Sequence, residues 1–157
     1  MTGGALVWGV KTSLMRYVRA LADGSIQVTD GAESAESGAF RFPFVEASED
    51  RRLLQYRGGL HWYGHSGLMD VTLSSPWVTL GATPSISMVV ALPDMPTERL
   101  TIAHMEVAAI ADDAWAGSRV RLTADGALTL GALQYSEYQQ VDDLDFSAPA
   151  SGRGNAE

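Results

Sequence analysis

The segment that organises the rest of the chain reads WGVKTSLMRYV and spans residues 8–18. A short apolar strand is expected over residues 6–10, and it turns directly into a helix expected over residues 11–22. Apolar residues recur in this segment at helical spacing and give the helix one apolar stripe: Val10, Leu14, Val18 and Leu21. Tyr17 lies beside that stripe, one helical turn after Ser13. The helix is therefore expected to direct a phenol and a hydroxyl toward the surface on which it packs.

Local signals also predict how this helix begins and ends. The side-chain oxygen of Thr12 or Ser13 is expected to cap the first turn. Asp23 and Gly24 are expected to end the helix, with Gly24 as the left-handed residue.

The rest of the chain predicts short strands separated by turns. Strands are expected over residues 25–29, 39–45, 53–63 with a flexible point at Gly58 and Gly59, 68–73, 76–80, 85–92, 100–110, 117–122 and 127–133. Pro43 indicates an edge strand, and residues 124–126 predict a hairpin turn. The pattern predicts a mainly β (α+β) fold, an antiparallel sandwich or barrel with one short N-terminal helix.

Length and composition limit the classes of function. The chain has 157 residues, which suits one domain, and this domain is expected over residues 1–146. The small, polar residues 147–157 are expected to form a disordered tail. The formal net charge of −8 argues against nucleic acid or an anionic membrane as partner. Without cysteine, disulfides and thiolate chemistry are excluded. No membrane span or signal peptide is visible.

The three histidines are the first candidates for a binding site. A period of two places His61, Tyr63 and His65 on one strand face, which is compatible with imidazoles lining a pocket; a surface His61 beside an exposed polar turn is the alternative. His104 lies in an apolar run and is expected to be a core histidine. No zinc spacing, phosphate loop, dinucleotide fingerprint or nucleophile elbow is present. The paired acids at 142–143 are expected to be solvated charge.

Two separated motifs resemble those of the HtaA-type haem-binding domains. Residues 8–13 followed by Tyr17 resemble the family's W-G-V-K-x-S…Y opening. Residues 59–70, GLHWYGHSGLMD, resemble G-x-V-x-F-x-G-H-x-G-x-L-D. Residues 134–142 resemble the family's F-Y-x-x-G-x-x-L-D-P, so the resemblance runs from about residue 6 to residue 146.

The resemblance implies a non-enzymatic domain that captures and transfers haem during iron acquisition by Gram-positive bacteria. It implies that Tyr17 ligates the ferric iron of protoporphyrin IX, that His65 supports the phenolate by a hydrogen bond, and that Tyr135 contributes to binding. His61 replaces an apolar family residue and brings a second imidazole into the neighbourhood, and Ser13 is expected to meet a propionate. Other haem-uptake proteins or haemoproteins are the implied donors. The implied location is extracellular or at the cell surface; an excised domain or a cytoplasmic form stays open.

A tyrosine ligand suits oxidised haem, because a phenolate is a hard anionic donor. A free phenol has a pKa of about 10, and both bound iron and an imidazole hydrogen bond favour its deprotonated form. A β-sandwich adhesion or carbohydrate-binding module is the alternative, since exposed indoles stack on sugars; its candidates are Trp8, Trp62, Trp77 and Trp115. Haem-dependent enzymology is a weaker alternative, because no acid/base set accompanies the site.

Overall fold

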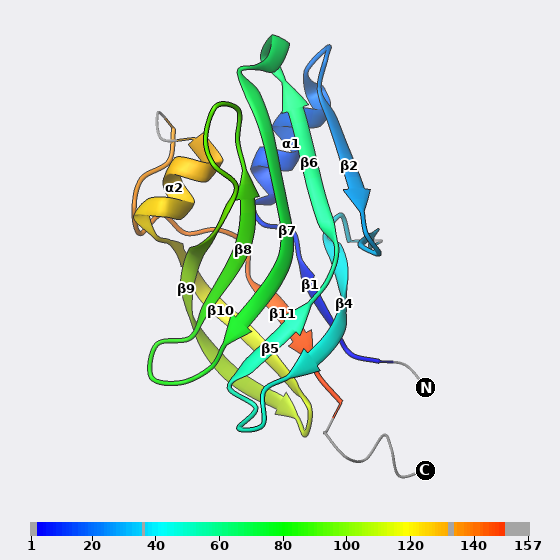
Figure 1. Cartoon of the computed structure of the whole chain (residues 1–157), viewed down its shortest axis with the longest axis vertical. Coiled ribbons are helices and arrows are strands. Elements are labelled where there is room, and N and C mark those ends of the chain that lie inside the picture. The colour runs from blue at the N-terminus through cyan, green and yellow to red at the C-terminus, as the bar shows by residue number, and fades with distance from the viewer. Residues whose placement is uncertain (1–2, 36, 132–133, 150–157) are drawn as a thin grey trace.

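The computed structural model describes residues 3–35, 37–131 and 134–149. Its strands are β1 (Ala5–Trp8), β2 (Ser25–Thr29), β3 (Glu33–Ser34), β4 (Phe40–Ala47), β5 (Leu53–Tyr56), β6 (Gly59–Gly64), β7 (Met69–Thr79), β8 (Ser85–Ala91), β9 (Glu98–Ala111), β10 (Ala114–Leu122) and β11 (Leu144–Ser147). The helices are α1 (Thr12–Ala20) and α2 (Ala124–Gly131), with a 3-10 turn, η1 (His65–Gly67). Figure 1 shows an elongated barrel with both helices toward its upper end.

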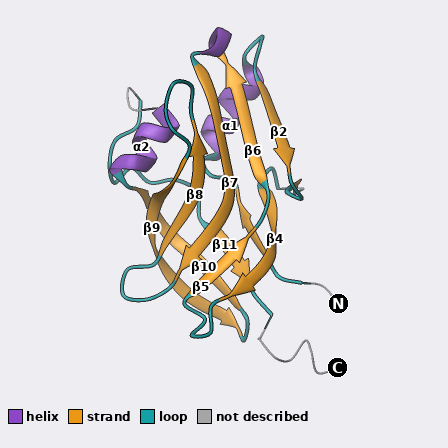
Figure 2. Ribbon diagram, viewed as in Figure 1, coloured by secondary structure: helices purple, strands orange, loops and turns teal. Residues whose placement is uncertain are grey.

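The strands of the described residues form one antiparallel sheet that closes into a barrel. The ring runs β7–β5–β4–β1–β11–β10–β9–β8, and β8 pairs again with β7. Beyond this ring, β6 pairs with β7, and β2 pairs with β6 as an outer strand. Figure 2 shows the strands as a tall wall with α1 and α2 beside its upper half. The predicted mainly β barrel is confirmed.

The upper rim exists because β7 changes neighbours halfway along its length. Its second half pairs with β5, and its first half pairs with β6. The chain leaves β5 and enters β6 at Gly58, whose φ of +118° favours glycine. A Cβ there would lie 2.7 Å from the Ala32 Cβ. The flexible point expected at Gly58 and Gly59 is therefore the break that lets β6 extend past the closed ring.

Aromatic side chains fill the barrel interior. The largest of them are less than 2% exposed: Trp8, Phe40, Phe42, Tyr56, Trp62 and Phe146. Eight strands enclose a space that side chains can fill completely. The interior of this barrel is accordingly a packed core.

The first turn of α1 is fastened to a residue far away in the sequence. The Thr12 N–H donates to both carboxylate oxygens of Asp142 at 3.0 Å, and the Thr12 hydroxyl donates to the same group. The Asp142 N–H donates to the Val10 carbonyl at 3.0 Å. Val10 is buried and has a φ of +62°, an unusual value for a β-branched residue. The expected cap by Thr12 or Ser13 is wrong, because Asp142 supplies the capping carboxylate.

The hairpin expected at residues 124–126 is also wrong, because these residues begin α2. The Thr123 hydroxyl accepts a hydrogen bond from the Gly126 N–H at 2.9 Å and donates one to the Thr101 carbonyl at 2.5 Å. A Cβ on Gly126 would lie 2.1 Å from the Ile102 carbonyl oxygen. The glycine of the Asp-Gly pair therefore lets α2 pack closely on β9. This second helix, α2, was not predicted from the sequence.

Two further expectations about the strands need correction. Pro43 lies in β4, which is an interior strand of the ring. Pro43 is tolerated because it lies between the part of β4 that pairs with β3 and the part that pairs with β5. Its carbonyl accepts a hydrogen bond from the Arg57 N–H, and no strand pairing requires a donor at the proline nitrogen. His104 is exposed on β9 and pairs across to Arg121, so it is no core histidine.

The end of the chain departs slightly from the expected boundary. Ser147 ends β11 and Ala148 is buried, so the folded part continues past residue 146. The rest of the expected tail, residues 150–157, lies outside the described residues. Within the described parts of the chain, neither helix has the length and apolar character needed to cross a bilayer.

Replacing Asp142 with alanine should destabilise the fold by about 1 kcal/mol, the usual cost of losing a helix cap. The corresponding fall in Tm is about 2–4 °C for a domain of this size. Thermal unfolding followed by circular dichroism measures it. The neighbouring Asp143→Ala variant removes the same charge from an exposed position and should leave Tm unchanged; equal losses in both variants would contradict the capping role.

Candidate functional site

A phenol and an imidazole meet at the upper rim of the barrel. Tyr17 lies on α1 and is 41% exposed, and His65 begins the η1 turn after β6. The Tyr17 hydroxyl oxygen lies 2.5 Å from His65 Nε2, and the ring centroids are 5.6 Å apart. The two residues are 48 positions apart in the sequence. The structure therefore brings together two residues that were expected to share a site.

Close packing fixes the end of α1 on the sheet. Leu14, Met15 and Val18 are buried beneath the helix. A Cβ on Gly24 would lie 1.8 Å from the Val18 carbonyl oxygen, and a Cβ on Gly64 would lie 2.6 Å from Leu21 Cδ1. Gly24 was expected to be left-handed, but its φ is not positive. Its role is to let the chain pass against the helix end.

The η1 turn that carries His65 has an unusual backbone. His65 and Ser66 have φ values of +51° and +55°, in the left-handed region. The carboxylate of Asp23 accepts the N–H of His65 at 3.1 Å and the N–H of Ser66 at 2.7 Å. These contacts lower the pKa of Asp23, with the Ser66 N–H as the main cause. Asp23, which follows α1 closely, thus holds the turn after β6.

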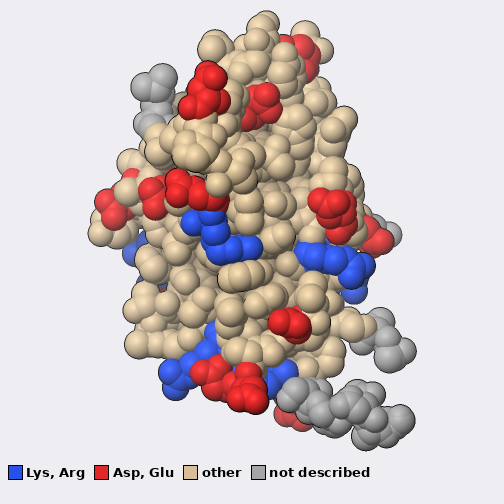
Figure 3. Space-filling model, viewed as in Figure 1, with Lys and Arg blue, Asp and Glu red and all other residues tan. Residues whose placement is uncertain are grey.

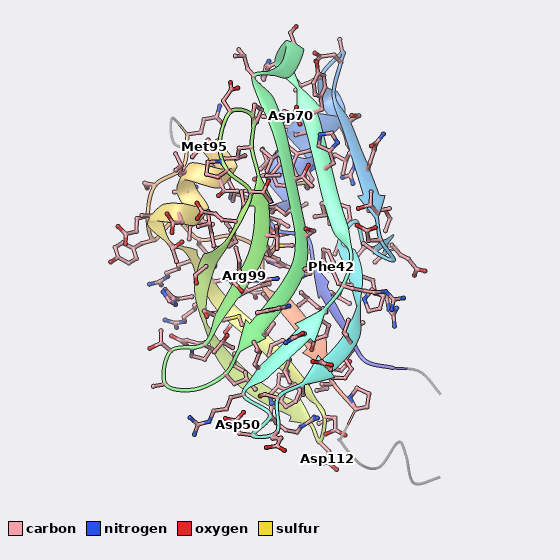
Figure 4. The ribbon with its side chains drawn as sticks, in the orientation of Figure 1. Phe42, Asp50, Asp70, Met95, Arg99 and Asp112 are labelled. Atoms are coloured by element: carbon pink, nitrogen blue, oxygen red, sulfur yellow. The ribbon has the colours of Figure 1, made fainter. Side chains whose placement is uncertain are left out.

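A groove of about 600 Å³ opens beside this pair. Its lining residues come from η1 and the residue after it, β7, the 92–97 segment, α2 and a residue beyond α2: His65, Leu68, Met69, Asp70, Val71, Leu92, Pro93, Met95, Leu128, Thr129, Leu130, Gly131 and Gln134. Three apolar members are exposed, Leu68 at 93%, Met95 at 48% and Leu128 at 48%. Asp70 and Met95 are labelled at the upper end in Figure 4. His65 belongs to both the groove and the tyrosine–histidine pair.

Charge is unevenly distributed on the face shown in Figure 3. Acidic residues are spread over its upper half, and basic residues form a band across the middle. Arg99, in the middle of the barrel wall (Figure 4), lies over the Trp77 ring with its guanidinium carbon 3.6 Å from the centroid. Burial lowers the pKa of Arg99. The groove itself is lined mainly by apolar side chains, and Asp70 is its acidic member.

The other predicted site residues lie in three different places. Ser13 is exposed on α1, one turn before Tyr17. Tyr135 follows α2, and Lys11 Nζ lies 5.9 Å from its ring centroid, so it is near the start of α1. Partial burial raises the pKa of Tyr135. His61 lies on the outer face of β6, and its Nε2 is 2.7 Å from Asp70 Oδ1.

The tryptophans offer little surface for stacking on a sugar. Trp8 and Trp62 are fully buried. Trp77 is covered on one face by the Arg99 guanidinium, and Trp115 is stacked on Phe146 with centroids 5.3 Å apart. The geometry does not supply the exposed indoles on which the carbohydrate-binding alternative depended.

Sequence reasoning missed three contributors to this rim. Asp23 was interpreted only as part of a helix stop, and Asp142 only as solvated charge. Leu128 was placed in a strand, although it projects from α2 into the groove. The one local signal for α2 was Thr123 before a run of small and apolar residues, which is an N-cap pattern.

These features define a class of protein: a closed antiparallel barrel with a tyrosine–histidine pair and an apolar groove at one rim. The sequence model of the HtaA family, described as Htaa, matches residues 3–147. The chain belongs to the HtaA family.

Solved structures show the same fold. The C-terminal domain of HtaA from Corynebacterium glutamicum is 22% identical, with a TM-score of 0.75 over 94% of this chain and 96% of that one. The N-terminal domain of the same protein is 22% identical, with a TM-score of 0.70 over 96% and 100%. The heme-binding protein HtaB from the same organism is 20% identical, with a TM-score of 0.72 over 93% and 91%. The search of curated proteins gave no match.

Replacing Gly24 with alanine should separate the end of α1 from the sheet, because the added Cβ cannot fit 1.8 Å from a carbonyl oxygen. We expect a destabilisation of about 1–3 kcal/mol and loss of the Tyr17–His65 contact. Thermal unfolding and nuclear Overhauser effects between the two rings measure these changes. Gly3, which has open space around its Cβ position, provides the control as Gly3→Ala. A stable Gly24→Ala variant with an intact ring contact would contradict this packing argument.

Proposed function

We propose that this chain is a non-enzymatic haem-binding domain that captures haem for iron acquisition. In this proposal the Tyr17 oxygen would hold the ferric iron of protoporphyrin IX, and His65 would be the hydrogen-bond partner of that oxygen. The observation that carries the proposal is the 2.5 Å contact between the Tyr17 hydroxyl and His65 Nε2 beside an apolar groove. Membership of the HtaA family supports it, as does the fold shared with the heme-binding protein HtaB.

The groove fits a flat, mainly apolar ligand with a polar edge. Its volume of about 600 Å³ falls within the range of about 300–1,000 Å³ typical of small-molecule sites. Leu68, Met95 and Leu128 are exposed at its margin, and clustered exposed apolar side chains mark binding surfaces. Polar groups are few, which is the usual composition of a cofactor site.

The tyrosine–histidine pair supplies the donor chemistry that haem iron requires. Tyrosine is among the side chains that hold haem iron. Haem supplies the Lewis-acidic iron that such an oxygen binds. Tyr17 is 41% exposed, so part of the residue is open to a ligand at the rim. In the proposal His65 Nε2 donates a hydrogen bond to the Tyr17 oxygen.

The remaining predicted residues have supporting roles in the proposal. Ser13 lies on the same side of α1 as Tyr17 and is assigned to a propionate, and Tyr135 is assigned to the ligand edge near Lys11. His61 is assigned an indirect role, because it bonds to Asp70, which lines the groove. The proposed setting is the cell surface, with other haem proteins exchanging haem with this domain.

Changing Tyr17 to phenylalanine removes the proposed ligand atom and leaves the ring. Loss of an outer-shell partner already weakens metal binding about 10–100-fold, so loss of the ligand should weaken ferric haem binding by more than about 100-fold. Titration with ferric haem followed by visible absorbance measures both the affinity and the tyrosinate-to-iron band. Tyr138→Phe makes the same change at a residue that is 70% exposed and lies in a different hollow, beside His104 and Arg121. Unchanged binding and an unchanged spectrum in Tyr17→Phe would exclude the proposed ligation.

Placing a charge on the groove wall should weaken haem binding without unfolding the domain. Leu128 lines the groove and is 48% exposed, so Leu128→Glu puts a carboxylate against the proposed macrocycle at little cost to the core. We expect affinity for haem to fall roughly tenfold or more, since each 1.4 kcal/mol of lost apolar contact is a factor of ten. Ile110→Glu, at an exposed position on β9, is the matched control. Equal affinities for the two variants would place the ligand outside this groove.

A further inference from the structure

We propose that Asp23 is the positioning residue of the site: its carboxylate holds the η1 turn so that the His65 imidazole stays against the Tyr17 hydroxyl. The proposal rests on the proposed haem function for its consequence in binding. Its geometric part concerns the chain alone and is tested without haem.

The carboxylate of Asp23 holds two consecutive backbone donors. Oδ1 accepts the His65 N–H at 3.1 Å, and Oδ2 accepts the Ser66 N–H at 2.7 Å. Successive N–H groups in such turns form a concavity that binds an anion. Hydrogen bonds to an ionised acceptor are stronger than neutral ones. Asp23 therefore acts on the backbone of the residue whose side chain reaches Tyr17.

The turn needs an external partner, because its conformation is unfavourable for its residues. His65 and Ser66 are left-handed in succession, at +51° and +55°. Side chains other than glycine are disfavoured there. Without Asp23 the turn can relax, and rotation about the His65 backbone then moves the imidazole away from the hydroxyl.

Asp23 is also close to Tyr17 along the chain. It follows α1 closely, so one short segment carries both the proposed ligand and the group that holds the ligand's partner. Leu21 contacts the region of Gly64, immediately before His65, which brings the two segments together. The spacing between phenol and imidazole is thus set locally, between the end of α1 and the start of η1.

The test is Asp23→Asn, which keeps the size of the side chain and removes its charge. In the haem-free protein, nuclear Overhauser effects between the Tyr17 and His65 rings should weaken strongly. In the haem-loaded protein, the dissociation rate of haem should rise about 10-fold or more, the usual effect of losing an outer-shell partner. Added to a His65→Ala background, Asp23→Asn should change the dissociation rate no further.

Asp50 provides the matched control at the opposite end of the barrel (Figure 4). Its carboxylate also holds a turn, accepting the Ser48 hydroxyl at 2.7 Å and the Arg52 N–H at 3.0 Å. Both aspartates are exposed and both have a lowered pKa. Asp50→Asn should therefore match any general effect of the substitution on stability and leave the ring contact and haem release unchanged.

A second variant separates relaxation of the turn from other damage. Ser66→Gly removes the steric penalty of the left-handed conformation. Combined with Asp23→Asn, it should restore part of the ring contact and slow haem release. Absence of any restoration would overturn the proposal, even if Asp23→Asn alone had weakened the contact.

The two proposals fail in different ways. If Asp23→Asn keeps the wild-type ring contact and dissociation rate while Tyr17→Phe loses haem, the positioning role is wrong and the ligation stands. If Tyr17→Phe binds haem normally, the proposed function fails. The effect of Asp23 on the haem-free ring contact then still decides its positioning role.

Discussion

The hydrogen bond between Tyr17 and His65 depends on holding a short helix and a strained turn in one relative position. A helix of nine residues is too short to be stable alone in water. Its place is set instead by three buried side chains, by Asp142 at its first turn and by the passage of Gly24 against its last turn. The barrel beneath it is filled with aromatic rings and provides a rigid base. The relative position of Tyr17 and His65 at the rim therefore depends on contacts throughout the domain.

Carboxylates at both ends of α1 carry out related tasks. Asp142 accepts the free N–H of Thr12, where the positive end of the helix dipole adds to the hydrogen bonds. Asp23 accepts the free N–H groups of η1. Each carboxylate binds backbone donors that no strand or helix satisfies. The segment between them, which contains Tyr17, is therefore fixed relative to the C-terminal part of the chain and relative to β6.

Local sequence patterns predicted those helices and strands whose position depends on neighbouring residues in the chain. Helical spacing around Leu14 and Val18 predicted α1, and alternation predicted β2, β4 and β8 at close to their observed positions. Alternation also placed His61 and His65 on one face, and here it misled. The left-handed backbone of η1 ends the alternation, so the His65 ring reaches Tyr17 while His61 stays on the outer face. The pair of Tyr17 and His65 was accessible only through family resemblance, because nothing local links positions 48 residues apart.

The packed interior has a consequence for the proposed function. Barrels of similar strand number can enclose a small ligand when their interior is hollow. Here the interior is occupied by side chains, and the groove at the rim is bounded by residues as exposed as Leu68. A ligand held there keeps one margin accessible to another protein. In the proposed function, such an open rim would suit a domain that passes haem on.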